Sequence, residues 1–178
     1  MFKHRVIFCR IRPGWASLGD PTGQEEPDKL RFAPLGVPAR GSRAMGLDPS
    51  MSVLVVDDYS TMVRIIRNLL RQLGFADVDD ASNGELALAK MHTKRYGLVI
   101  SDWNMEPMTG YELLRQVRSD PGLQETPFIM VTAESKTENV IAAKKAGVNN
   151  YIVKPFNAQT LKAKIEAVFL ERAQAQAE

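Results

Sequence analysis

Four short aliphatic segments, each followed by a polar or charged residue, constrain most strongly what this chain can fold into. Segments of this length between polar turn residues are typical of strands buried on both faces of a parallel sheet. In such a sheet the ligand site lies beyond the carboxyl ends of the strands. The sequence therefore predicts that three carboxylates, a hydroxyl and an ammonium group meet in one crevice. The segments 53–56, 98–101, 128–131 and 151–153 are followed by Asp57 and Asp58, by Asp102, by Thr132 and by Lys154.

This combination of side chains suits a divalent cation and a phosphoryl group. Clustered carboxylates repel one another unless a cation lies among them, and Mg2+ prefers oxygen ligands. An aspartate carboxylate can attack a phosphoryl group to form an aspartyl phosphate. The ammonium group of Lys154 and the metal would neutralise charge on the transferring group, and Thr132 would donate a hydrogen bond to it. A phosphoryl-accepting site is therefore the first functional hypothesis.

Helical segments alternate with these strands. Apolar residues recur at helical spacing after the strands, and Gly74 and Gly147 mark two helix ends. Five βα units with short connections predict an α/β fold, in which helices cover both faces of a doubly wound parallel sheet. The remaining elements are a strand at 78–81 and helices at about 60–73 (capped by Ser60 or Thr61), 83–93 (opened by Asn83), 110–118, a segment ending near 146, and 157–170.

The residues at the strand ends, together with Tyr151, resemble the signature of response-regulator receiver domains over about residues 51–170. The resemblance implies a flavodoxin/CheY-like fold, with five helices around a five-stranded parallel sheet in the order 2-1-3-4-5. One departure lies at 105–110, which reads Met-Glu-Pro-Met-Thr-Gly where the family commonly has Met-Pro-x-Met-Asp-Gly. The segments most similar to chemotaxis regulators of the CheY type are Asp-Tyr-Ser-Thr-Met (58–62), Asp-Trp-Asn-Met (102–105), Met-Val-Thr-Ala-Glu (130–134) and Val-Lys-Pro-Phe (153–156).

The same resemblance implies a role for each residue at the strand ends. Asp102 is the implied phosphoacceptor, and Lys154 and Thr132 are its implied catalytic partners. The peptide bond between Lys154 and Pro155 is implied to be cis. Mg2+ is the implied cofactor, and its implied ligands are Asp58, Asp102, the backbone carbonyl of Asn104 and, through water, Asp57.

Two further residue pairs have implied roles in signalling. Thr132 and Tyr151 stand at the switch positions of the family, where a hydroxyl drawn toward the phosphoryl group makes room for the ring to rotate. Asn104 and Glu134 stand at positions that tune spontaneous dephosphorylation. The fourth helix, the fifth strand and the last helix, around Tyr151 and Lys164, are the surface implied to change shape and bind a target.

The resemblance implies a single-domain response regulator of a chemotaxis-like two-component pathway. A CheA-like histidine kinase would supply the phosphoryl group, and a target such as the flagellar motor switch would bind the phosphorylated form. The alternative is a phosphate sink or phosphorelay shuttle without a motor target. A phosphatase of the haloacid-dehalogenase type is rejected, because those enzymes carry Asp-x-Asp with the nucleophile on the first strand. We do not expect a stand-alone enzyme. The only reactions expected of the chain itself are Mg2+-dependent autophosphorylation and autodephosphorylation.

Composition separates an N-terminal extension from the receiver domain. Residues 1–50 hold six of the twelve Gly, six of the ten Pro, and eight basic against five acidic residues. We interpret them as a disordered extension or the product of a misassigned start, followed by a receiver domain at 51–172 and a frayed tail at 173–178. The charge of +2 therefore arises in the extension and gives no indication of nucleic-acid binding. A single Cys and the lack of a membrane-length apolar segment favour a cytoplasmic protein with no membrane partner, and we expect a monomer.

Overall fold

The computed structural model describes residues 48–133 and 137–175. Most of the predicted extension, Glu134 and residues 176–178 lie outside the described residues. The domain boundaries and the role of Glu134 therefore stay predictions. Among the residues that are described, no helix is both long and apolar enough to cross a membrane.

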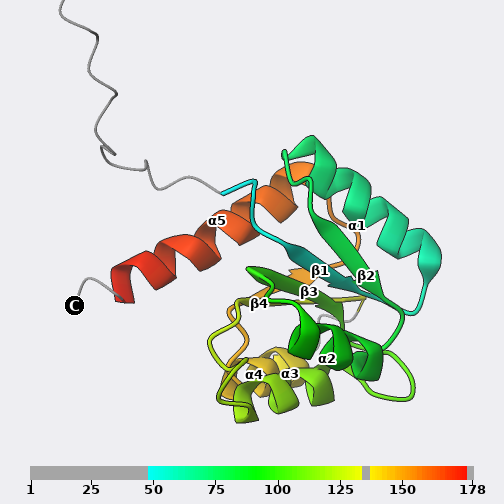
Figure 1. The fold of residues 1–178 in the computed structure, drawn as a ribbon, viewed down its shortest axis with the longest axis vertical. Coiled ribbons are helices and arrows are strands. Elements are labelled where there is room, and N and C mark those ends of the chain that lie inside the picture. The colour runs from blue at the N-terminus through cyan, green and yellow to red at the C-terminus, as the bar shows by residue number, and fades with distance from the viewer. Residues whose placement is uncertain (1–47, 134–136, 176–178) are drawn as a thin grey trace, which may run out of the picture. The chain divides into compact units, whose positions relative to one another are not determined.

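The core of the fold is a parallel sheet of five strands in the order β2-β1-β3-β4-β5 (Figure 1). This is the predicted order, and it is confirmed. The aliphatic strands β1, β3 and β4 are buried along their whole length, because helices cover both faces of the sheet. The strands are β1 (Val53–Val56), β2 (Val78–Ala81), β3 (Leu98–Asp102), β4 (Phe128–Thr132) and β5 (Asn150–Val153).

Five helices complete the doubly wound architecture and divide the core into two halves. One half packs side chains of α1 and α5 against the sheet, and the other packs side chains of α2 and α3. Figure 1 shows α4 beside α3 on that second face. The helices are α1 (Ser60–Gln72), α2 (Gly84–Thr93), α3 (Gly110–Ser119), α4 (Thr137–Lys145) and α5 (Ala158–Ala175).

Most helix ends lie where the sequence predicts them. The Asn83 side chain caps α2 by accepting a hydrogen bond from the backbone N–H of Leu86 at 2.9 Å. Gly74 and Gly147 follow α1 and α4 with φ of 96° and 88°, a backbone region that favours glycine. The predicted cap of α1 is wrong, because the helix already includes Ser60 and no side chain caps it.

The last helix is longer than predicted. It continues to Ala175, whereas the pattern of apolar residues predicts an end near 170. Its buried residues are Leu161, Ile165 and Val168, and Phe169 also packs against the core, so residues 170–175 extend beyond the packed part of the helix. The alanine and glutamine residues there have high helix propensity, and no glycine or proline follows to end the helix.

Candidate functional site

The strand order brings four of the predicted site residues to one edge of the sheet. Strands β1, β3, β4 and β5 are consecutive neighbours, and Asp57, Asp102, Thr132 and Lys154 lie at or directly after their carboxyl ends. The register aligns these ends, because Asp102 pairs with Val131 and Thr132 pairs with Val153. The site is therefore assembled by parallel pairing of segments that are far apart in the sequence.

Lys154 joins two of the carboxylates. Its Nζ atom lies 2.6 Å from Oδ1 of Asp102 and 3.0 Å from Oδ2 of Asp57. The exposed fractions of the Asp57, Asp102 and Lys154 side chains are 1%, 8% and 20%. The Lys154–Pro155 bond that follows the ammonium group is cis, as the resemblance implies. Three charged groups thus lie in direct contact and largely out of water, where their interaction is stronger than at the surface.

Burial sets the protonation equilibria of this cluster. It raises the pKa of the Asp102 carboxyl, and the nearby charge of Asp57 raises it further, although the Lys154 ammonium opposes both effects. Burial acts to lower the pKa of Lys154, but its hydrogen bonds to Asp102 and Asp57 outweigh that effect and leave the pKa raised. Lys154 therefore keeps its positive charge, whereas the negative charge of ionised Asp102 is not fully offset by the groups around it.

The carboxylate oxygens of Asp57 and Asp102 are held by hydrogen bonds but can accept further ones. Oδ1 of Asp57 accepts a hydrogen bond from the backbone N–H of Tyr59 at 2.9 Å, and Oδ2 of Asp102 accepts one from the backbone N–H of Asn104 at 2.7 Å. Each of these four oxygens thus accepts one hydrogen bond from the described residues, and a carboxylate oxygen has two lone pairs. Lone pairs remain for a hard cation, which favours oxygen ligands.

Asp58 differs from these two carboxylates in its burial. It is exposed, and the part of the chain that the structure describes contains no group of three or more His, Cys, Asp or Glu side chains arranged to hold a metal. Three aspartates against one lysine still leave two uncompensated negative charges at this edge of the sheet. A divalent cation would match that charge, so the donor set fits Mg2+.

The two predicted switch residues lie on one face of the sheet. Met130 pairs with Tyr151, so their side chains point to the same side, and Thr132 shares that side because it follows Met130 by two residues. Thr132 is buried, with 1% of its surface exposed, whereas Tyr151 is half-buried and packs against the core half beneath α2 and α3. Their predicted roles are not tested by this arrangement.

Gly110 is a site residue that sequence reasoning missed. A Cβ atom built at this position would lie 1.9 Å from the backbone oxygen of Asp102, so α3 begins in contact with the end of β3. The preceding Thr109 forms a capping box with Glu112. Thr109, which lies in the loop that departs from the family pattern, is therefore the N-cap residue of α3. The Thr-Gly pair before a helical segment is the sequence signal that points to this contact.

Replacing Gly110 with Ala is expected to lower the free energy of unfolding by about 1–3 kcal/mol or more, because a rigid backbone oxygen occupies the space of the new methyl group. Urea denaturation followed by circular dichroism measures the change. Gly84→Ala is the matched control, since Gly84 is also the buried first residue of a helix but its Cβ would meet the flexible Met108 side chain. An equal loss of stability in both variants would contradict the argument.

Comparison with known proteins agrees with this geometry. The family model for the response regulator receiver domain matches residues 53–166. The chemotaxis protein CheY of Pseudomonas aeruginosa is 53% identical over 119 residues, which cover 67% of this chain and 96% of that protein. The solved structure of CheY4 of Vibrio cholerae is 35% identical, with a TM-score of 0.63, and the match covers 67% of this chain and 98% of that one.

A second solved structure adds information about a metal ion. The receiver domain of a sensor histidine kinase from Pseudomonas aeruginosa is 25% identical, with a TM-score of 0.62. The match covers 67% of this chain and 98% of that domain. That structure has a magnesium ion coordinated in its active-site cleft.

Proposed function

This chain belongs to the response regulator receiver domain family, with CheY chemotaxis proteins among its relatives, and we propose that it signals by accepting a phosphoryl group on Asp102. The single observation that carries the proposal is the Lys154 ammonium, which lies between Asp102 and Asp57 at a largely buried sheet edge. That arrangement supplies both a carboxylate nucleophile and a fixed positive charge for the transferring group.

The chemistry at Asp102 is a direct phosphoryl transfer. A carboxylate oxygen of Asp102 forms a bond to phosphorus while the bond between phosphorus and the donor nitrogen of a phosphohistidine breaks. The backbone N–H of Asn104 orients the carboxylate. Lys154 neutralises negative charge on the phosphoryl oxygens, so transfer depends on positioning and electrostatics rather than on a general base.

The proposed metal ligands are Asp58, Asp102 and the backbone carbonyl of Asn104, with Asp57 acting through water. When bound, Mg2+ supplies the charge that offsets the excess of carboxylates and of phosphoryl oxygens. Asp57 also holds Lys154 in place through the 3.0 Å contact.

The proposed partners are a CheA-like histidine kinase as the donor and a target such as the flagellar motor switch. Thr132 and Tyr151 would carry the signal from the acceptor to the surface formed by α4, β5 and α5. Asn104 and Glu134 would set the lifetime of the aspartyl phosphate. We propose that the protein acts in the cytoplasm as a monomer, and that it is a phosphoacceptor rather than a stand-alone enzyme.

Labelling with a small phosphodonor tests this proposal. Incubation with acetyl phosphate and Mg2+ is expected to add one phosphoryl group to the protein, detected by mass spectrometry of the intact chain. Addition of a chelator, or the substitution Asp58→Ala, is expected to reduce labelling to background, because the excess negative charge would then be uncompensated. Labelling that persists at the same rate with a chelator would contradict the proposed role of the metal.

A further inference from the structure

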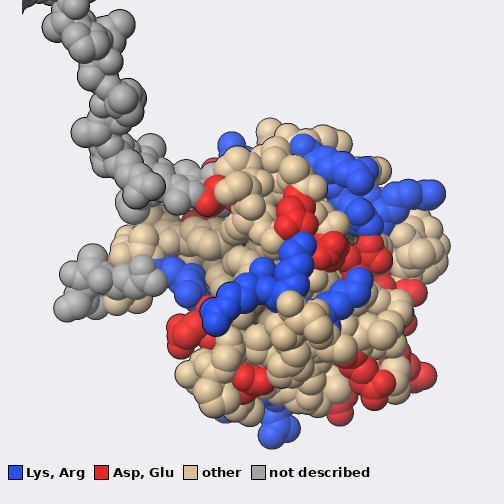
Figure 2. All heavy atoms as spheres, in the orientation of Figure 1, with Lys and Arg blue, Asp and Glu red and all other residues tan. Residues whose placement is uncertain are grey.

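One arginine, Arg118, makes contacts that the acceptor chemistry does not explain. It lies in the last turn of α3, near the amino ends of β4 and β5, whereas the acceptor site lies at the carboxyl ends of the strands. Figure 2 shows basic side chains gathered at the surface over α1, but Arg118 is half-buried, and burial lowers the pKa of its guanidinium group. Among residues 48–133 and 137–175 it forms no ion pair with a carboxylate. A charge taken out of water in this way must be compensated by hydrogen bonds.

The Arg118 guanidinium group joins two loops to α3 through hydrogen bonds. Its Nη1 atom donates to the backbone oxygens of Gln124 and Thr126, which precede β4, at 2.7 and 2.9 Å. Its Nε atom donates to the backbone oxygen of Gly147 at 2.8 Å, and its Nη2 atom donates to Oδ1 of Asn149 at 2.9 Å. Gly147 and Asn149 lie 29 and 31 residues further along the chain. One side chain of α3 thus holds both the loop before β4 and the connection from α4 to β5.

The same connection is also fixed to β4. Oδ1 of Asn149 accepts a second hydrogen bond from the backbone N–H of Phe128 at 2.8 Å, and the backbone N–H of Asn149 donates to the oxygen of Phe128 at 3.0 Å. The N–H of Gly147 closes the last turn of α4 by donating to the backbone oxygen of Lys144 at 3.0 Å. The carboxyl end of α4 is therefore bound to α3 through Arg118 and to β4 through Asn149.

Helix α4 itself packs weakly on the domain. Ala143 is the one buried residue of this helix, and it belongs to neither half of the core. Helix α3, in contrast, buries the side chains of Leu113, Leu114 and Val117. An element that buries little apolar surface changes position at small cost in free energy, whereas its hydrogen-bonded end cannot move without breaking those bonds. The exposed residues of α4 are Thr137, Glu138, Ile141, Lys144 and Lys145.

We propose that Arg118 is the anchor about which α4 tilts when the target-binding surface responds to phosphorylation. This inference rests on the proposed function, because a phosphoryl group on Asp102 would drive the response. Helix α4 begins shortly after Thr132 ends β4, so its amino end lies on the acceptor side of the domain, and its carboxyl end is held near the opposite edge of the sheet. A change at Thr132 therefore moves the amino half of α4, while the carboxyl end stays on α3. Arg118 is a positioning residue in this scheme and takes no part in the transfer itself.

Hydrogen exchange followed by mass spectrometry, with and without acetyl phosphate and Mg2+, tests the proposal. In the unmodified chain, phosphorylation is expected to change the exchange rate of residues 137–142 by at least about 3-fold and that of residues 143–149 by less than about 1.5-fold, since local opening reports local contacts. In Arg118→Met the phosphorylation-dependent change is expected to spread to 143–149. A purely structural role would raise exchange there equally with and without acetyl phosphate. Labelling of Arg118→Met is expected to change by no more than about 2-fold, because Arg118 is remote from the acceptor site.

Two further variants complete the test. Arg118→Lys keeps the positive charge but lacks the planar fork of donors, so it is expected to behave like Arg118→Met, and it carries the comparison if Arg118→Met does not fold. Arg115→Met is the matched control, because Arg115 is an exposed arginine one turn earlier on the same helix, and it is expected to behave like the unmodified chain.

Three results would overturn the anchor proposal. One is a labelled unmodified chain in which 143–149 changes as much as 137–142, or in which neither changes. Another is a change that stays confined to 137–142 in the folded Arg118 variants, and the third is an equal spread in Arg115→Met. If acetyl phosphate fails to label the unmodified chain, the proposed function itself fails, so the two failures are distinguishable.

Discussion

Replacing Asp102 with Asn is expected to abolish phosphoryl labelling by acetyl phosphate, with a loss of at least ~10³-fold, since removal of a covalent nucleophile costs that much or more in enzymes. The amide keeps the shape of the side chain but has no anionic oxygen to attack phosphorus. Asp57 is not expected to substitute for it. The Asp57 side chain is only 1% exposed, and its two oxygens are held by Tyr59 and Lys154.

The labelling experiment needs evidence that the variant is folded and that the loss is local. Asp102→Asn removes one of two neighbouring carboxylates, so thermal denaturation is expected to show no large loss of stability. Asp120→Asn is the control, because Asp120 follows α3 and has no contact with Lys154. Undiminished labelling of a folded Asp102→Asn protein would show that Asp102 is not the acceptor.

Much of the sheet could be predicted from the sequence, for a physical reason. Strands buried on both faces must be aliphatic along their whole length, and this leaves a signal that does not depend on the rest of the chain. Strands β1, β3 and β4 accordingly lie within one residue of their predicted ends. Helix ends carry weaker signals. The end of α5 is the clearest example, since residues 170–175 extend beyond the part of the helix that packs on the core.

The sequence predicts which residues form the candidate site, but it does not predict the contacts between their side chains. The pattern of aliphatic segments places carboxylates and a lysine directly after the strands. Since the carboxyl ends of parallel strands share one edge of the sheet, these side chains are expected to meet there. The pattern does not reveal that one ammonium contacts both Asp57 and Asp102, which lie 97 and 52 residues away from Lys154 in sequence. That double contact depends on the directions of the three side chains, which have no local sequence signal.

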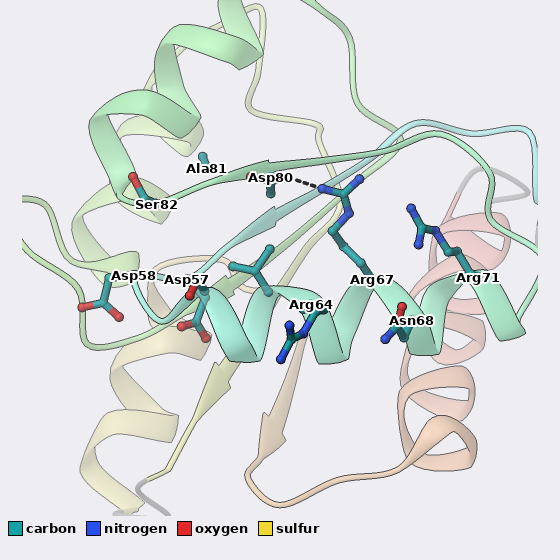
Figure 3. A pocket seen from close by; sticks show the side chains of 11 residues that line it. Asp57, Asp58, Arg64, Arg67, Asn68, Arg71, Asp80, Ala81 and Ser82 are labelled. Carbon is teal, nitrogen blue, oxygen red and sulfur yellow. Dashed lines mark hydrogen bonds and ion pairs between the residues drawn. The ribbon is translucent and has the colours of Figure 1, made fainter.

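The arginines of α1 illustrate the same limit. The spacing of Arg64, Arg67 and Arg71 in the sequence predicts a solvated face rather than a binding surface, because a helix that packs one side on the core leaves its other side charged. What the spacing does not reveal is that Asp80 of β2 lies beside α1 and pairs with Arg67, as the dashed line in Figure 3 marks. That pairing is a property of tertiary structure.

Thr132→Ala is expected to separate phosphorylation from its output. Thr132 ends β4, between the strand that carries Asp102 and the strand that precedes Lys154, and its side chain shares one sheet face with Tyr151. A phosphoryl group on Asp102 cannot itself contact the surface of α4 and α5, so an element with two conformations must carry the signal. The hydroxyl is the proposed sensor of the phosphoryl oxygens, and Tyr151 is the proposed reporter.

The variant is therefore expected to accept a phosphoryl group at Asp102 but to lose most of the gain in affinity for the flagellar motor switch protein. Coupling between two sites in a protein is typically about 1–3 kcal/mol, or roughly 5–150-fold in affinity. Titration of the switch protein with and without acetyl phosphate measures the gain. Thr132→Ser is the matched control, since it keeps the hydroxyl and is expected to keep most of the gain. If Thr132→Ala retained the full gain, the signal would have to leave the acceptor site without this hydroxyl, and the neighbouring Lys154 would become the candidate sensor.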